Sequence, residues 1–181
     1  ETPVKLTEHQ RKLLKELEES GFISTYIPFG KTVNESIYKL SDEYSLFYQK
    51  FIENAKATGE GTWLRQIQAH SYISWSGFAF EAVCHKHSRQ IKNALGIGDV
   101  LTEESSWRYL PPKGSGNKGA QIDLLLDRKD RTINVCEIKF AGDEFVIDKK
   151  YAEELDNKLS AFRRETGTKK TLFLTMITTY G

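Results

Sequence analysis

Apolar residues recur at helical spacing at the start of the chain and then alternate with polar residues over two short stretches. Residues 7–19 carry a leucine stripe, and Thr7 is followed three positions later by Gln10, a pattern typical of an amphipathic helix with a capping box. Gly21 supplies a residue suited to the end of that helix. The pattern then predicts a strand, a turn, a second strand and a second helix, at residues 22–27, 28–31, 36–40 and 42–51.

The order helix, two-stranded hairpin, helix is similar to the later part of a winged-helix domain. The alternative is a small helix–hairpin module that serves only packing. Four basic residues accompany the first helix but are interleaved with glutamates: Lys5, Arg11, Lys12 and Lys15. This interleaving disfavours DNA binding by the N-terminal part of the chain.

The second part of the chain alternates helical and strand-like patterns in a different order. The predicted helices and strands are 63–74, 77–95, 100–109, 121–126, 133–140, 148–164 and 171–178. From the helix at 77–95 onward the order is α, β, β, β, α, β. Because the middle strands form a hairpin, the expected fold class is a mixed α/β (α+β) sandwich and not a doubly wound sheet.

A polar, glycine-bearing stretch at residues 56–61 separates the two parts. We therefore expect a partial winged-helix-like domain at 1–55, a linker at 56–61 and a second domain at 62–181. The chain begins with Glu1 and its single methionine is Met176. We expect from this that the sequence is a piece of a longer protein.

Composition narrows the class of protein. The chain has 181 residues, of which 39% are hydrophobic, so intrinsic disorder is excluded as the default. No apolar run approaches the roughly 20 residues that span a bilayer, and the net charge of +1 argues against a dedicated polyanion binder. Cys84 and Cys136 are too few for a disulfide framework. We expect a cytoplasmic protein with reduced thiols and no membrane partner.

Three charged residues stand out in the predicted hairpin. Asp123 interrupts an apolar strand, and Glu137 and Lys139 share one face of the next strand because side chains alternate. A turn centred on Asp130 would place Asp123 directly opposite Glu137, on the same face of the sheet. A register slip of one residue would separate them.

Two opposed carboxylates repel each other, so the fold needs a lysine, a divalent cation or a raised pKa to offset the repulsion. Lys139 lies on the same face, and carboxylates are the ligands that Mg²⁺ and Mn²⁺ prefer. Glu81, in the preceding helix beside an apolar stripe, adds a third carboxylate. The layout predicts a hard-metal site with an adjacent cation, which suits phosphate chemistry.

The arrangement Asp123, Glu137-x-Lys139 with helical Glu81 upstream resembles the PD-(D/E)XK nuclease superfamily, whose fold is that of restriction endonucleases. The resemblance implies that Asp123 and Glu137 bind Mg²⁺ or Mn²⁺, with Glu81 supporting the metal, and that Lys139 activates the attacking water. Gln121 lies two residues before Asp123 and, because side chains alternate along a strand, is expected to point into the same site. The chain departs from the family pattern in having no proline before Asp123. The loop at 111–119 is expected to border the substrate groove.

A second resemblance covers nearly the whole chain. The stretches that carry it are 38–42, 47–52, 77–81, 119–128 and 134–140. They are similar to the C-terminal half of archaeal-type AAA ATPases, in which an ATPase module precedes a winged helix and a nuclease-like domain. The resemblance implies two partners, nucleic acid (DNA above all) and an N-terminal ATPase module of the same protein. The phosphate-binding loop G-x-x-x-x-G-K-[ST] is absent from this sequence, so we expect no ATPase activity from it.

Other interpretations stay open. A zinc site could be formed by Cys84, His85 and His87, but the sequence has no convincing second pair of ligands. Helix packing is the better explanation for Cys84 and His87. The acids and the lysine also fit an internal ion-pair network left after loss of catalysis. A non-catalytic module that binds nucleic acid or protein and regulates the attached ATPase is the alternative function.

Overall fold

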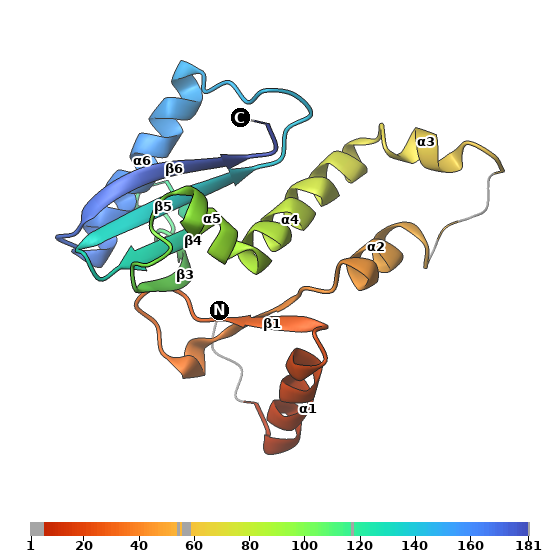
Figure 1. Cartoon of the computed structure of the whole chain (residues 1–181), viewed down its shortest axis with the longest axis horizontal. Helices are drawn as coiled ribbons and strands as arrows, with labels where there is room; N and C mark the ends of the chain where they lie inside the picture. The colour runs from red at the N-terminus through yellow and green to blue at the C-terminus, as the bar shows by residue number, and fades with distance from the viewer. Residues whose placement is uncertain (1–5, 54, 56–58, 117, 181) are drawn as a thin grey trace. The chain divides into compact units, whose positions relative to one another are not determined.

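The computed structural model describes residues 6–53, 55, 59–116 and 118–180. It is a mixed α/β structure with a two-stranded antiparallel sheet and a four-stranded mixed sheet (Figure 1). The chain divides into two compact units. Unit 1 comprises Glu1–Ile27 and Lys31–Trp75, and unit 2 comprises Pro28–Gly30 and Ser76–Gly181. The predicted linker at 56–61 falls partly outside the described residues, since positions 56–58 are not among them.

Unit 1 contains the predicted helix, hairpin and helix. Its elements are α1 Glu8–Glu19, β1 Ile23–Tyr26, the 3-10 helix η1 Val33–Glu35, β2 Ile37–Leu40, α2 Glu43–Phe51 and α3 Thr62–Gln66. The capping box of α1 is confirmed: the backbone N–H of Gln10 donates to Thr7 Oγ1 at 3.3 Å, and that of Thr7 donates to the Gln10 side chain at 2.9 Å. Asp42 caps α2 by accepting from the Ser45 N–H.

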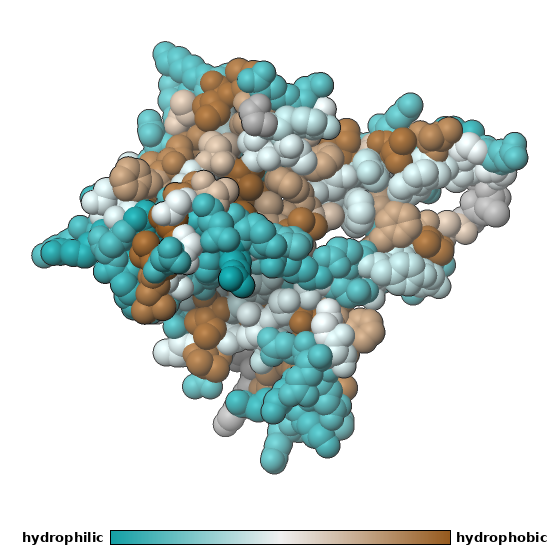
Figure 2. Space-filling model, viewed as in Figure 1, coloured by the Kyte–Doolittle hydropathy of each residue, from teal (hydrophilic) through white to brown (hydrophobic). Residues whose placement is uncertain are grey.

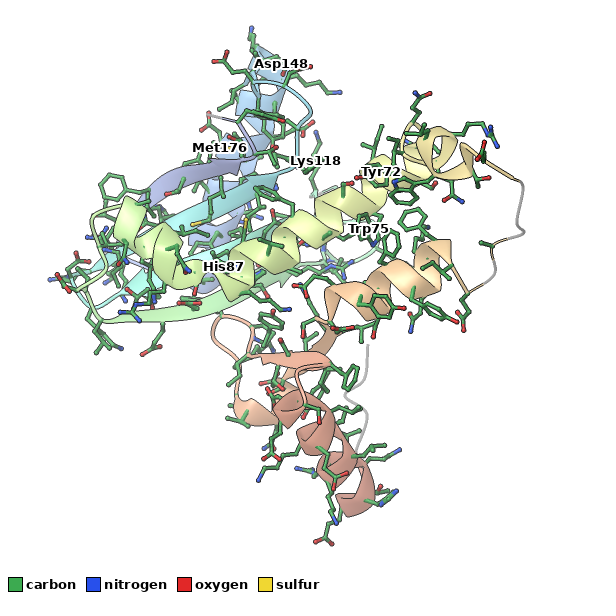
Figure 3. All side chains as sticks on the ribbon, turned by 45° about the vertical axis from the view of Figure 1, so that its right-hand side comes forward. Tyr72, Trp75, His87, Lys118, Asp148 and Met176 are labelled. Carbon is green, nitrogen blue, oxygen red and sulfur yellow. The ribbon has the colours of Figure 1, made fainter. Side chains whose placement is uncertain are left out.

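An aromatic cluster packs α2 and α3 against the start of α4 (His70–Lys86). Its rings are those of Phe47, Phe51, Trp63, Tyr72 and Trp75, with centroids 5.2–6.1 Å apart. Figure 3 labels Tyr72 and Trp75 on α4. Figure 2 shows apolar surface in the region of α3, and Leu64 of this helix is 65% exposed. Edge-to-face ring pairs dominate this cluster, so it has the geometry of a packed core.

Unit 2 follows the predicted order of elements. After α4 come α5 Ser88–Ala94, β3 Thr102–Tyr109, β4 Ala120–Arg128, β5 Thr132–Lys139, α6 Lys149–Thr166 and β6 Thr171–Thr178. The strand order is β3-β4-β5-β6, with the first two pairs antiparallel and β5 parallel to β6. The prediction of one helix at 77–95 was wrong. The helix breaks at His87, whose backbone φ and ψ are −107° and 24°.

Two apolar layers enclose the four-stranded sheet, as expected for a sandwich of helices on both faces. One layer joins α6 to the sheet through Phe162, Ala161, Trp107, Ile122, Leu125, Ile133 and Val135. The other joins α4 and α5 to the opposite face through Cys84, Ile97, Leu124, Leu126, Cys136 and Ile138. Figure 1 shows α5 in front of the sheet and α6 behind it. The middle strands are therefore buried on both faces.

Strand β4 contains a β-bulge. Ser105 pairs with Leu125 and Trp107 pairs with Ile122, so β4 has one residue more than β3 over this interval. The extra residue lies at positions 123–124, and it brings Ile122 and Leu125 onto the same, α6-facing layer. A bulge of this kind re-aims a side chain, and here it occurs at Asp123.

Among the described residues, no helix has both the length and the apolar character that crossing a membrane requires.

Candidate functional site

The β4–β5 hairpin brings Asp123 and Glu137 to neighbouring positions. Leu124 pairs with Cys136 and Leu125 with Val135, so the predicted register, with its turn centred on Asp130, is confirmed. The regular ladder stops at Leu124–Cys136, one pair before the two acids. There the Asp123 carboxylate takes part in the pairing, because the Ile138 N–H donates to Asp123 Oδ2 at 3.2 Å.

Glu137 lies at the centre of a buried polar cluster. Glu137 is only 3% exposed. Lys158 Nζ lies 2.5 Å from Oε2, and Lys139 Nζ lies 3.1 Å from Oε1. The Tyr151 hydroxyl donates to Oε1 at 2.8 Å. Burial acts to raise the pKa of Glu137, but Lys158, Tyr151 and Lys139 together outweigh it and hold the pKa below its ordinary value.

Asp123 has the opposite electrostatic environment. Burial raises its pKa, and the negative charges of Glu137 and Glu81 raise it further. The Ile138 N–H and the charge of Lys158 act the other way without cancelling these effects. The two acids are thus unequally compensated: Glu137 is stabilised as a carboxylate, whereas the negative charge of Asp123 remains unfavourable.

Glu81 acts on this site electrostatically. It lies on α4, where His85 Nε2 is 3.8 Å from Glu81 Oε1 one helical turn away. Its field raises the pKa of Asp123 and contributes to raising that of Cys84. The predicted four-residue set is therefore arranged as a close group of Asp123, Glu137 and Lys139, with Glu81 acting on Asp123 from the helix.

Two residues of the cluster were missed from the sequence, Tyr151 and Lys158 of α6. Asp148, labelled at the start of α6 in Figure 3, caps the helix by accepting from the Tyr151 N–H at 2.7 Å. Tyr151 and Lys158 fall at the helical spacing of buried Leu155 and Phe162, which places them on the inner face. That spacing was the feature of the sequence that could have identified them. It is a weak indication for Lys158, because lysines at the border of an apolar stripe usually extend into water.

The prediction for Gln121 relied on strict alternation with Asp123. The bulge interrupts that alternation, and Gln121 is exposed and pairs with Arg108 across the β3–β4 ladder. Of the predicted loop at 111–119, residue 117 lies outside the described residues.

Within the described ranges, no group of three or more His, Cys, Asp or Glu side chains is placed to hold a metal ion. The donor set near the acids is a pair of carboxylates, Asp123 and Glu137, with Glu81 beyond. Hard oxygen donors of this kind suit Mg²⁺ or Mn²⁺. The unfavourable charge of Asp123 is also the kind that a nearby cation stabilises, so the residues fit a hard divalent ion.

Both cysteines are buried and free. Burial raises the pKa of Cys84 to about 11 and that of Cys136 to about 12. Such thiols remain protonated near neutral pH and are poor nucleophiles. Their place in the apolar layer between α4 and the sheet accords with packing.

Comparison of the chain with models of known protein families, with curated proteins and with solved structures gives no match.

Proposed function

We propose that unit 2 is a nuclease-like domain that hydrolyses phosphodiester bonds of nucleic acid, DNA above all, with Mg²⁺ or Mn²⁺. The observation that carries this proposal is the convergence at the β4–β5 hairpin. Asp123 and Glu137 lie side by side there, and two lysines, Lys139 and Lys158, contact the Glu137 carboxylate. Acids beside cations in a partly buried site suit the stabilisation of charge on a phosphate.

The element order supports the proposal at the scale of the fold. The order α, β, β, β, α, β and the D…E-x-K pattern resemble the PD-(D/E)XK superfamily, and the hairpin register needed for that pattern is present. We extend the proposal to the whole chain: unit 1 is winged-helix-like, and the two units correspond to the C-terminal region of an archaeal-type AAA ATPase. The partner implied is an N-terminal ATPase module.

Asp123 and Glu137 would hold the metal, with Glu81 supporting it electrostatically. When bound, the metal supplies Lewis-acid chemistry: it lowers the pKa of water and offsets charge on the phosphate. The Ile138 N–H fixes the Asp123 carboxylate. Lys139 is 37% exposed at its side chain, so it can both contact Glu137 and reach solvent, where it would orient the attacking water.

Cleavage assays test the proposal directly. Single- and double-stranded DNA and RNA would be incubated with the chain and Mg²⁺ or Mn²⁺, with a chelator as the blank. We expect the wild type to cut at least one substrate, and Asp123→Ala, Glu137→Ala and Lys139→Ala to lower the rate by 100-fold or more, as for loss of a main catalytic group (roughly 10²–10⁴-fold). Glu144→Ala, an exposed acid beyond β5, is the control and should keep the wild-type rate.

The Glu137 cluster also favours a second candidate, a non-catalytic module that binds nucleic acid or protein and regulates the attached ATPase. Both Glu137 oxygens already have close partners, which is what a structural ion-pair network looks like. The assay separates the two functions. Binding that persists in all three alanine variants, with no cleavage by any form, would establish the binding module and exclude the enzyme.

A further inference from the structure

Lys158 occupies a position that the D…E-x-K pattern does not explain. Its Nζ lies 2.5 Å from Glu137 Oε2, closer than Lys139 lies to Oε1. It comes from α6, so its position depends on the packing of that helix on the sheet. The charge of Lys158 also acts on Asp123, whose pKa it lowers. One ammonium thus acts on both carboxylates assigned to the metal.

An ammonium and a divalent cation cannot share one carboxylate oxygen at these distances. Mg²⁺ requires its oxygen ligands at about 2.0–2.1 Å, and a positive charge already in contact with the same oxygen would repel it strongly in a buried site. Binding of the metal to Glu137 Oε2 therefore requires Lys158 to leave. Its side chain is 25% exposed, and its flexible four-carbon stem allows the ammonium to swing outward.

Lys139 differs from Lys158 in how it is held. Its Nζ lies 5.4 Å from the centre of the Tyr151 ring, within cation–π distance. Tyr151 in turn donates its hydroxyl hydrogen to Glu137 Oε1. Lys139 therefore has a second contact that keeps it at the site if Glu137 binds a metal. Lys158 is held at the site by its ion pair with Glu137.

We propose that the Lys158 ammonium competes with the divalent cation for Glu137, and that metal binding displaces Lys158 toward the substrate phosphate. This inference rests on the proposed function. Lys158 acts as a positioning residue: it neutralises buried Glu137 in the metal-free protein and becomes a phosphate contact in the loaded one. The cost of burying an unpaired carboxylate is thereby avoided in both states.

Calorimetric titration of Mn²⁺ into the full chain tests the competition. Lys158→Met keeps the aliphatic length and removes the charge, Lys158→Gln provides a second uncharged variant if the first does not fold, and Lys158→Arg keeps the charge. The matched control is Lys150→Met, an exposed lysine on the same helix. Circular dichroism and thermal melting establish that each variant is folded.

We expect Lys158→Met to bind Mn²⁺ on the order of tenfold more tightly than the wild type, because a like charge beside the ion is removed. Lys150→Met and Lys158→Arg should stay within about threefold of the wild type. In a second measurement, duplex DNA binding in Ca²⁺, the dependence of log affinity on log salt should become shallower by about 0.9 in Lys158→Met, as expected for one lost phosphate contact.

The outcomes separate the inference from the function on which it rests. If the wild type binds Mn²⁺ in an Asp123-dependent manner but Lys158→Met binds no more tightly, the competition is wrong and the metal site stands. If neither protein binds Mn²⁺, the proposed function fails and the inference with it. If only Lys158→Met binds, the competition is supported in its strongest form. An unchanged salt dependence would overturn the phosphate contact alone.

Discussion

The charge of Asp123 beside Glu137 lowers the stability of the folded protein. Burial and the charge of Glu137 raise its pKa above the usual 3.8. The folded state therefore binds a proton more readily than the unfolded state does, and stability falls as the pH rises from the usual value through the folded-state pKa. Above that window the chain carries the full unfavourable charge.

Asp123→Asn should accordingly stabilise the metal-free protein near neutral pH. The amide oxygen can still accept from the Ile138 N–H while the charge is removed, and we expect a gain of roughly 0.5–1 kcal/mol, the scale of a like-charge pair across a sheet. Urea unfolding at pH 7.5 and at pH 3.5 measures it. The gain should disappear at the lower pH, and Asp143→Asn, on the exposed loop after β5, should show no such gain. An equal gain at both pH values would contradict the electrostatic origin.

The residues of the site differ in how far the sequence could predict them. The proximity of Asp123 and Glu137 followed from local information, since the polar turn around Asp130 and the strand pattern set one register. The bulge at Asp123 arises from pairing with β3, so the sequence of the β4–β5 hairpin does not predict it. Lys158 was missed for a similar reason: its contact with Glu137 spans 21 positions and depends on where α6 packs.

At the scale of elements, the ends of strands and helices were predicted best where special residues mark them. Strand β6 has the predicted bounds, Thr171–Thr178, and the helix predicted to start at residue 148 is α6, which Asp148 caps. The break at His87 was not predicted because the apolar spacing of Phe80, Cys84 and Ile91 runs through α4 and α5 alike. Periodicity reports which face is buried, and it does not report a local change of backbone direction.

Helix α6 carries Tyr151 and Lys158, so its C-terminal stop bears on the site. Gly167 ends the helix with φ 63°, and its N–H donates to the Arg163 carbonyl at 3.0 Å. A side chain at this left-handed position is strained, so Gly167→Ala should destabilise the protein by about 1 kcal/mol. Urea unfolding gives the value. Gly142→Ala is the control, because Gly142 has no positive φ and open space around its added Cβ; a loss equal to that of Gly167→Ala would contradict the backbone explanation.

At the scale of the whole molecule, unit 2 draws on a segment far from it in sequence. Residues 28–30 belong to unit 2. Within them, the Phe29 ring packs edge-on against Phe162, with centroids 5.1 Å apart, and its N–H donates to the Ser106 carbonyl at 2.8 Å. Phe162 is a residue of α6 and is fully buried. The hydrophobic layer that holds α6 on the sheet is thus completed by a residue from the hairpin region.

A chain cut to residues 62–181, the second domain predicted from the sequence, would lose this contact. We expect the cut chain to be less stable than unit 2 in the full chain. Phe29→Ala in the full chain should reproduce most of this loss of stability. The expected loss is roughly 1–3 kcal/mol for a half-buried ring, below the 3–5 kcal/mol of a fully buried one. Hydrogen exchange of the α6 amides measures the stability of unit 2 in both proteins.

The control is Phe22→Ala, which removes a 45% exposed ring of unit 1 and should leave the protection of the α6 amides unchanged. If α6 were equally protected in the cut chain and the full one, Phe29 would be dispensable. If protection falls as expected, Phe29 also supports the placement of Tyr151 and Lys158, because the helix that carries both depends on that layer.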